Sequence, residues 1–154
     1  MVQINSPVGY LDITASDAGI QSIFFSEQKT DTKTPSPLLS EAIVQLEEYF
    51  AGNRTTFDLP LNPQGTDFQK RVWKELLNIP FGETISYIEV SRRLGDEKAI
   101  RAVGLANGKN PISIIIPCHR VIGSNGKLVG YGGGLWRKEW LLKHEGCMTQ
   151  ESLF

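Results

Sequence analysis

One short segment of the chain contains residue types that could perform covalent chemistry. Cys118 and His119 are adjacent and follow the apolar run 114–116, so we expect the thiol to be buried. A cysteine thiol has a pKa of ~8.5 and is mostly protonated at neutral pH, but a neighbouring base or cation increases its reactive fraction. His119 could be that base, and Arg120 adds a positive charge. The segment predicts a cysteine nucleophile, although a buried structural cysteine fits the same pattern.

The adjacency of Cys118 and His119 restricts how they could cooperate. Neighbouring side chains of an extended segment point in opposite directions, so their contact requires a turn or a bridging water molecule. If His119 is the base, an acid should orient its second ring nitrogen. The sequence offers several acids, and spacing alone does not select one.

A metal site is an alternative use of the same segment. The candidate ligands are all the cysteines and histidines of the chain, namely Cys118, His119, His144 and Cys147. The last two have usable ligand spacing, but the first two are adjacent and make a poor pair for one tetrahedral ion. We therefore expect neither a metal ion nor another cofactor.

The elements that precede this segment are predicted to be helical. Thr66 or Asp67 caps a first helix, and Ser86 begins a second that ends at Gly95. A third helix runs from about Glu97 to Ala106. Two helices joined by a short glycine-containing turn are typical of a helix-turn-helix. Small residues would let the last of these helices approach a partner surface closely, and they are Ala99, Ala102, Gly104 and Ala106.

The rest of the C-terminal half is predicted from shorter signals. Residues 112–116 read as a buried extended segment, and residues 124–127, which contain an Asn-Gly pair, read as a hairpin turn. Residues 135–144 form a final helix. Ser86 and Glu89 have the spacing of a capping box.

The N-terminal half predicts a small sheet covered by one helix. Residues 8–14 and 19–25 are rich in β-branched and aromatic side chains and are separated by a turn signal. Ser36 caps a helix with Pro37 at its first position, and Gly52 ends it. This half contains no cysteine and no histidine, so we expect the chemistry elsewhere.

The fold class is therefore α+β. A small N-terminal antiparallel sheet with a covering helix precedes a mainly helical, winged-helix-like C-terminal domain that contains the helix-turn-helix. The predicted domains are residues 1–62 and 66–147, followed by a tail at 148–154.

Composition excludes several classes of protein. With 40% hydrophobic and 21% charged residues among 154, the chain reads as globular. Its apolar runs are far shorter than the ~20 residues that span a bilayer, so we expect no membrane association. The first residues lack the pattern of a secretory signal, and two cysteines are too few for a disulfide scaffold. These features favour a cytoplasmic location.

Charge is distributed unevenly along the chain. Residues 1–65 contain three cations and eight acids, whereas residues 70–138 contain twelve cations and five acids. The net charge of -1 argues against a nucleic-acid-binding protein, but this asymmetry suggests that one half faces a polyanion. Chance segregation of surface charge fits it equally well.

The segment Pro117-Cys118-His119-Arg120-Val121 resembles the active-site signature of the O6-alkylguanine-DNA alkyltransferases, also called methylated-DNA–protein-cysteine methyltransferases. The resemblance is specific over residues 66–147 and loose in the N-terminal half. Further segments in the order and spacing expected of that family are Ile85-Ser86-Tyr87, Arg101-Ala102-Val103-Gly104, Asn110-Pro111, Lys138-Glu139-Trp140-Leu141-Leu142 and His144-Glu145-Gly146.

The resemblance implies a chemical role for four side chains. Cys118 would take the alkyl group of O6-alkylguanine, and of O4-alkylthymine, irreversibly and once per molecule. His119 would remove the thiol proton through a water molecule, and Glu145 would hold His119 in the required tautomer. Tyr87 would direct its hydroxyl to N3 of the purine.

The resemblance also implies an interface with double-stranded DNA. Arg101 would fill the gap left by a flipped-out nucleotide, and Ala102 and Gly104 would let the helix enter the minor groove. Asn110 would join this helix to the segment of Cys118, and Ser124 would contact a phosphate. We expect a monomer that needs no obligate protein partner.

Four further residues are placed around the substrate by the same resemblance, namely Val121, Tyr131, Gly132 and Lys138. The backbone near Cys118 and Val121 would read the exocyclic amine. Relatives often have a serine near the position of Gly132, so only a main-chain N–H can contact O6 at that point here.

Two other classes fit the residues: a helix-turn-helix binding module in which the cysteine is incidental, and a cysteine hydrolase that uses Cys118, His119 and Glu145 and turns over.

Overall fold

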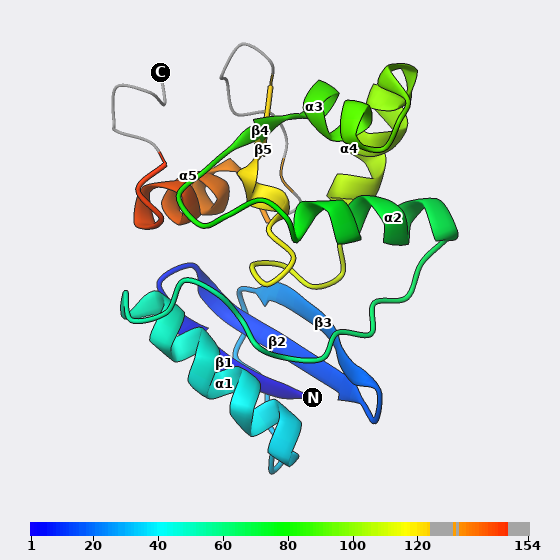
Figure 1. Ribbon diagram of the computed structural model, residues 1–154. Coiled ribbons are helices and arrows are strands. Elements are labelled where there is room, and N and C mark those ends of the chain that lie inside the picture. The colour runs from blue at the N-terminus through cyan, green and yellow to red at the C-terminus, as the bar shows by residue number, and fades with distance from the viewer. Residues whose placement is uncertain (124–130, 132, 148–154) are drawn as a thin grey trace. The chain divides into compact units, whose positions relative to one another are not determined.

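The computed structural model describes residues 1–123, 131 and 133–147 (Figure 1). The chain forms two units, the first comprising Met1–Gln64 and Pro111–Ser113, the second Gly65–Asn110 and the chain from Ile114 onward. Within the described residues, no helix has both the length and the apolar composition needed to cross a bilayer. The predicted hairpin turn at 124–127 and the tail at 148–154 lie outside the described residues.

The first unit is a three-stranded antiparallel sheet with one covering helix, as the sequence predicted (Figure 1). The strands are β1 (Val2–Ser6), β2 (Gly9–Ser16) and β3 (Gly19–Ser26), in that order across the sheet. Leu11 and Ile13 alternate with partly exposed residues on β2 and are fully buried, because successive side chains of a strand point to opposite faces.

Helix α1 (Pro37–Phe50) packs on this sheet. The predicted cap is confirmed, since the Ser36 hydroxyl accepts a hydrogen bond from the Leu39 N–H and Pro37 occupies the first turn. Leu39, Ala42 and Leu46 recur at helical spacing and are buried, so the helix presents one apolar stripe to the sheet.

A short segment from the middle of the chain completes the first unit. Ile112 forms a parallel bridge with Ile23, and the Ile23 N–H donates to Pro111 O at 2.9 Å. The sequence predicted an extended segment over 112–116, but only Ile112 pairs in this way, and a turn follows in which Ile114 has a φ of 74°. That prediction is wrong because an apolar run indicates burial without specifying the backbone conformation.

The second unit is mainly helical. It contains α2 (Asp67–Leu76), α3 (Tyr87–Arg93), α4 (Ile100–Gly108) and α5 (Leu135–His144), and a parallel pair of short strands, β4 (Ile85–Ser86) and β5 (Val121–Ile122). Of the two predicted caps for α2, Thr66 is the correct one, and it forms a reciprocal capping box with Gln69.

Helices α3 and α4 form the predicted helix-turn-helix, with a 3-10 turn at Glu97–Ala99 between them. Gly95 has a φ of 90°, a conformation that favours glycine, and ends α3. The Ser86 hydroxyl accepts from the Glu89 N–H, while the Glu89 carboxylate lies near Arg92 and Arg93.

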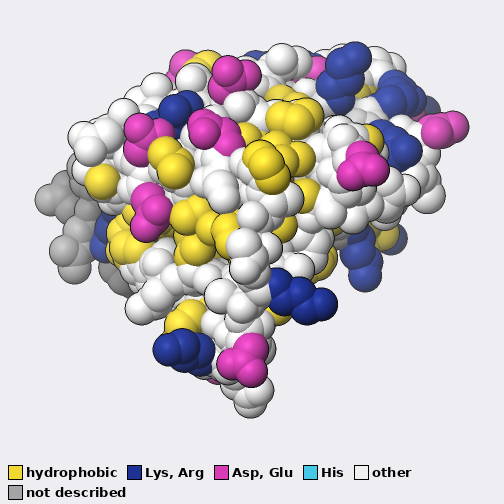
Figure 2. All heavy atoms as spheres, turned by 90° about the horizontal axis from the view of Figure 1, so that it is seen from below, with side chains coloured by type: hydrophobic (Ala, Val, Ile, Leu, Met, Phe, Trp, Pro, Cys, Tyr) yellow, Lys and Arg dark blue, Asp and Glu magenta, His cyan; other side chains and the backbone are white. Residues whose placement is uncertain are grey.

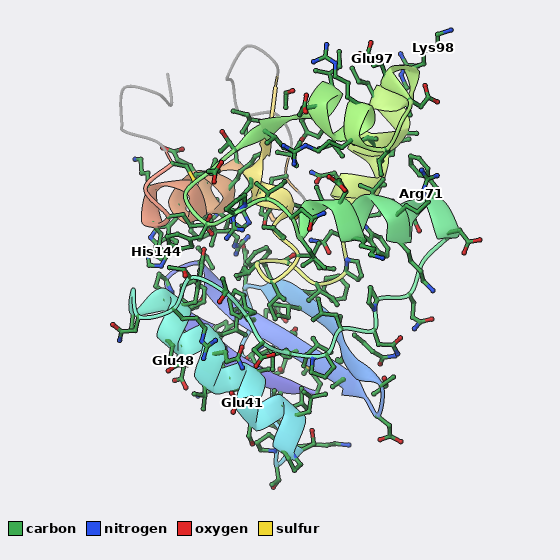
Figure 3. The ribbon with its side chains drawn as sticks, in the orientation of Figure 1. Glu41, Glu48, Arg71, Glu97, Lys98 and His144 are labelled. Carbon is green, nitrogen blue, oxygen red and sulfur yellow. The ribbon has the colours of Figure 1, made fainter. Side chains whose placement is uncertain are left out.

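Two side chains of α2 hold this pair of helices in place. Trp73 is buried and its indole N–H donates to Ala106 O of α4 at 2.8 Å. Arg71, labelled in Figure 3, donates to Leu94 O at the end of α3. Helix α2 therefore fixes the orientation of α4, the helix that leads toward Cys118.

Candidate active site

Cys118 begins a 3-10 turn, Cys118–Arg120, that leads directly into β5. The Cys118 N–H donates to Ile116 O at 2.8 Å, and the Arg120 N–H donates to Pro117 O at 3.0 Å. This is the turn that the adjacency of Cys118 and His119 required. Both side chains are buried, His119 completely.

His119 and Arg120 converge on one carboxylate. His119 Nε2 lies 2.7 Å from Glu145 Oε2. Arg120 donates from Nε to Oε1 at 2.7 Å and from Nη2 to Oε2 at 3.1 Å, while its Nη1 donates to Ile79 O at 2.6 Å. The structure thus singles out Glu145 from the candidate acids.

The charge on Glu145 fixes the tautomer of His119. Burial alone raises the pKa of Glu145, but the hydrogen bonds and positive charges of His119 and Arg120 outweigh it and lower that pKa to about 2. Burial lowers the pKa of His119, so the ring is neutral at pH 7. Because the carboxylate can only accept, Nε2 carries the proton and Nδ1 carries a lone pair.

That lone pair is available to act as a base. His119 Nδ1 is buried and has no hydrogen-bond partner among the residues that the structure describes. A neutral imidazole with one nitrogen anchored to a carboxylate and the other directed elsewhere is the arrangement of a general base.

The Cys118 thiol is protonated at rest. Burial raises its pKa, and this effect outweighs the hydrogen bonds of Asn110 and Tyr131 and the positive charge of Lys138, which all lower it. Any reaction at this sulfur therefore requires removal of its proton by a neighbouring base.

Lys138 brings a buried ammonium to the site. It comes from α5, is fully buried, and donates from Nζ to Val121 O at 2.7 Å. Nζ also lies 5.9 Å from the centroid of the Tyr87 ring. Burial lowers the pKa of Lys138 to about 8, against the effect of a negative charge on Cys118.

Tyr87 and two asparagines complete the polar surroundings of the cysteine. Burial raises the pKa of Tyr87, and a hydrogen bond with the Asn107 side chain lowers it. Asn110 Nδ2 donates to Ile116 O at 2.8 Å, and Asn107 Nδ2 donates to Cys118 O at 3.4 Å. Asn110 thus joins the end of α4 to the turn before Cys118.

The structure gathers most of the sequence-predicted site residues and leaves others on the surface. Gathered around the sulfur or its partners are His119, Glu145, Tyr87, Asn110, Val121, Tyr131 and Lys138. Arg101, Ala102 and Gly104 lie on the accessible side of α4, where a Cβ added to Gly104 would meet nothing within 4 Å. Ser124 and Gly132 lie outside the described residues.

Sequence reasoning did not identify the roles of two gathered side chains. Arg120 was considered as a cation beside the thiol, but it pairs with Glu145 instead. Asn107 reads in the sequence only as the start of a turn after the third helix, whereas the structure places it in the last turn of α4, and its contact with Cys118 O comes from a distant segment.

The four candidate metal ligands do not come together. His144 stacks on Trp140 at 4.8 Å between ring centroids, and Cys147 Sγ lies 3.9 Å from Glu83 O. In the described part of the chain, no three His, Cys, Asp or Glu side chains are grouped so that they could hold a metal ion.

Comparison with known proteins gives matches along nearly the whole chain. Residues 67–147 match the model of the 6-O-methylguanine DNA methyltransferase DNA-binding domain, and residues 3–63 match that of the ribonuclease-like domain. The methylated-DNA–protein-cysteine methyltransferase of Methanosarcina acetivorans is 49% identical over 92% of this chain and 94% of its own. That of Mycobacterium tuberculosis is 52% identical over 92% and 89%.

A solved structure resembles this chain in both fold and sequence. The Mycobacterium tuberculosis protein in complex with DNA superposes with a TM-score of 0.85 at 53% identity, covering 94% of this chain and 91% of that one. Fold and sequence therefore point to the same relatives.

Proposed function

The chain belongs to the 6-O-methylguanine DNA methyltransferase family, and from this premise we propose that it repairs O6-alkylguanine in duplex DNA by moving the alkyl group to Cys118. The observation that carries this proposal is the buried thiol beside a neutral His119 that is anchored to Glu145. The relatives' names support the substrate, and the geometry supports Cys118 as the nucleophile and His119 as the base.

The reaction is a single displacement. His119 Nδ1 takes the thiol proton through a water molecule, and the sulfur attacks the alkyl carbon. The S–C bond forms as the C–O6 bond breaks, and the electron pair of the broken bond goes to the purine. The resulting guanine anion takes up one proton, equivalent to the one that His119 removed from the thiol, and leaves as neutral guanine. The thioether that remains on Cys118 is a poor electrophile, so the transfer is irreversible and each molecule reacts once.

Two groups contact the leaving purine, and two others act on the sulfur. The Tyr87 hydroxyl donates a hydrogen bond to N3 of the purine, where negative charge develops as the C–O6 bond breaks. The Lys138 ammonium favours negative charge on the sulfur before attack and holds Val121 O in place. The backbone near Cys118 and Val121 accepts a hydrogen bond from one of the two N–H groups of the exocyclic amine. Tyr131 assists by its hydrogen bond to the thiol.

Access to the alkyl carbon requires extrusion of the nucleotide from the duplex. Helix α4 enters the minor groove with Ala102 and Gly104 against the DNA, and Arg101 fills the gap in the stack. Minor-groove binding reads little sequence, which suits repair at any site. O4-alkylthymine, which also carries an alkylated exocyclic oxygen, is a second substrate. The protein acts as a monomer without an obligate protein partner.

Mass measurement tests the proposal. Incubation with an excess of duplex containing O6-methylguanine should add one methyl group per molecule, located on Cys118. The Cys118→Ala variant should bind the same duplex and gain no mass. Cys147→Ala is the matched control and should be methylated like the wild type.

The two other classes both predict a protein that keeps its original mass, but they differ in what happens to the substrate. A cysteine hydrolase would consume many substrate molecules and return to its original mass, and a binding module would neither gain mass nor alter the lesion. Either result contradicts the proposal.

A further inference from the structure

Asn107 is a buried amide that the mechanism above does not use. It lies in the last turn of α4 and is only 5% exposed. Its Oδ1 atom has no hydrogen-bond partner within residues 1–123, 131 and 133–147. A buried acceptor without a partner is costly, so such an atom in a reaction site needs a donor, which a bound ligand can supply.

The surroundings of Asn107 determine which of its two amide atoms is the oxygen. One of them lies 3.4 Å from Cys118 O, which can only accept a hydrogen bond, so that atom must be the NH2 group. The side chain also forms a hydrogen bond with Tyr87. The amide is therefore held between the reactive segment and the tyrosine, and Oδ1 is the atom left to contact a ligand.

The chemistry of the substrate limits what Oδ1 can bind. On O6-alkylguanine the ring atoms N1 and N3 are acceptors, and O6 carries the alkyl group. The 2-amino group is the donor on this edge of the base, and it is bonded to C2, the atom next to N3. Under the proposed function Tyr87 donates to N3, so a side chain hydrogen-bonded to Tyr87 lies beside the 2-amino group.

We propose that Asn107 is a specificity-determining residue whose Oδ1 accepts a hydrogen bond from the 2-amino group of the extruded guanine. This inference rests on the proposed function. It implies that the site favours O6-alkylguanine over O6-alkylhypoxanthine, which lacks the amine. It also implies slower reaction with O4-alkylthymine, whose O2 would place a second acceptor opposite Oδ1.

Paired substrates test the inference without relying on absolute rates. The rate of methyl transfer to Cys118 is measured with two duplexes that differ only in carrying O6-methylguanine or O6-methylhypoxanthine. For the wild type we expect the guanine lesion to react at least about tenfold faster, as for a site that recognises its substrate through a hydrogen bond. In Asn107→Leu this ratio should fall by about tenfold, mainly through slower reaction of the guanine lesion.

Two further variants separate recognition from positioning. Asn107→Asp keeps an acceptor oxygen and loses the NH2 group, so the ratio should stay near the wild-type value even if both rates fall. Asn78→Leu makes the same chemical change at an exposed position and should alter neither rate.

Several outcomes would overturn the inference. Equal slowing of both lesions in Asn107→Leu would assign the residue to positioning alone. Equal wild-type rates with the two lesions would exclude recognition of the amine. This comparison uses the wild-type protein alone and so does not depend on whether a variant folds. A wild-type protein that gains no mass with either lesion contradicts the proposed function and this inference together, whereas transfer without a preference contradicts this inference and the backbone contact to the amine but leaves alkyl transfer to Cys118 in place.

Discussion

Single residues set the reactivity of the site through opposing effects on charge. Burial makes the Cys118 thiolate unfavourable, and the Lys138 ammonium, also buried, makes it less so. Either charge without the other is energetically unfavourable in this environment, since both groups are removed from water. The arrangement holds a neutral thiol at rest, and the Lys138 ammonium stabilises the anion once a base has removed the proton.

Lys138 should make the stability of the protein depend on pH in alkaline solution. Its pKa is about 8 in the folded protein and about 10.5 unfolded, so the unfolded chain binds more protons between these values. The free energy of unfolding should therefore rise with pH from about 8 to 10.5 relative to Lys138→Met, by up to about 3 kcal/mol. Denaturant titrations of both proteins at pH 7, 8.5 and 10 measure this difference.

The matched control is Lys143→Met, which removes an exposed lysine from the same helix. The difference between wild type and this variant should stay constant over the same range. A constant difference for Lys138→Met as well would show that the ammonium is not disfavoured by burial.

Among single residues, the sequence identified the candidate reacting groups more readily than the side chains that contact them. Cys118 and His119 are adjacent, so their types made them candidates for nucleophile and base, although a buried structural cysteine fitted the same pattern. Glu145 lies 26 residues from His119, and only the resemblance to a family selected it among the acids. Arg120 and Asn107 act through partners brought close by folding, and no local pattern reveals such contacts.

Secondary-structure elements position these groups, and their ends matter most. Glu145 follows the last turn of α5, Tyr87 begins α3, and Asn107 and Asn110 lie at the end of α4. A helix that ends near the site can place a side chain there without its backbone filling the space beyond. The ends of three helices can therefore surround one reaction site. Helix α4 has a second use, because its accessible side carries Arg101.

Arg101 should matter for duplex DNA and not for a free base. In Arg101→Ala the extruded nucleotide loses the side chain that fills its place, so transfer from O6-methylguanine in duplex should slow by at least about tenfold, since extrusion costs a few kcal/mol. Reaction with free O6-benzylguanine, which needs no extrusion, should change less than about twofold. Single-turnover rates with both substrates measure this.

The control for this substitution is Lys33→Ala, which removes an exposed cation from the first unit and should leave both rates unchanged. If Arg101→Ala slowed both substrates equally, its effect would lie in the folding of α4 or in the chemistry, and the extrusion role would be excluded.

Elements with strong periodicity or caps were predicted well, and irregular ones were not. The start of α1 at Pro37 and the whole of α5 agree with the structure, because caps and apolar spacing are local signals. Strand β1 was missed, since its five residues include three polar ones and its pairing depends on β2. The turn after Ile112 was wrongly predicted as extended. Its backbone conformation is fixed by contacts with other segments, and the local sequence does not reveal those contacts.

On the scale of the whole molecule, charge is the property that bears on DNA. The face drawn in Figure 2 carries acidic, basic and hydrophobic side chains together. Twelve cations lie between residues 70 and 138, but several are committed within the protein. Arg92 and Arg93 lie near acids of neighbouring turns, and Arg120 and Lys138 are buried. The excess of cations in the sequence therefore overstates what can reach a phosphate.

Six exposed cations remain in the described part of that range, and they are Lys70, Arg71, Lys74, Lys98, Arg101 and Lys109. Lys98 is labelled in Figure 3, in the turn before α4. Each phosphate neutralised contributes about −0.9 to the slope of log K against log salt. Binding to undamaged duplex should therefore give a slope no steeper than about −5, whereas twelve contacts would give about −11.

Titrations of the Cys118→Ala variant with fluorescent duplex between 50 and 250 mM salt measure this slope without alkyl transfer. Lys109→Gln should make the slope shallower by about 1 if this cation contacts a phosphate, and Lys29→Gln, in the acidic N-terminal half, should not change it. A slope near zero would show that the charge asymmetry is unrelated to DNA. A slope steeper than about −6 would require more phosphate contacts than these six cations can supply, either from the ion-paired Arg92 and Arg93 or from Lys127, which lies outside the described residues.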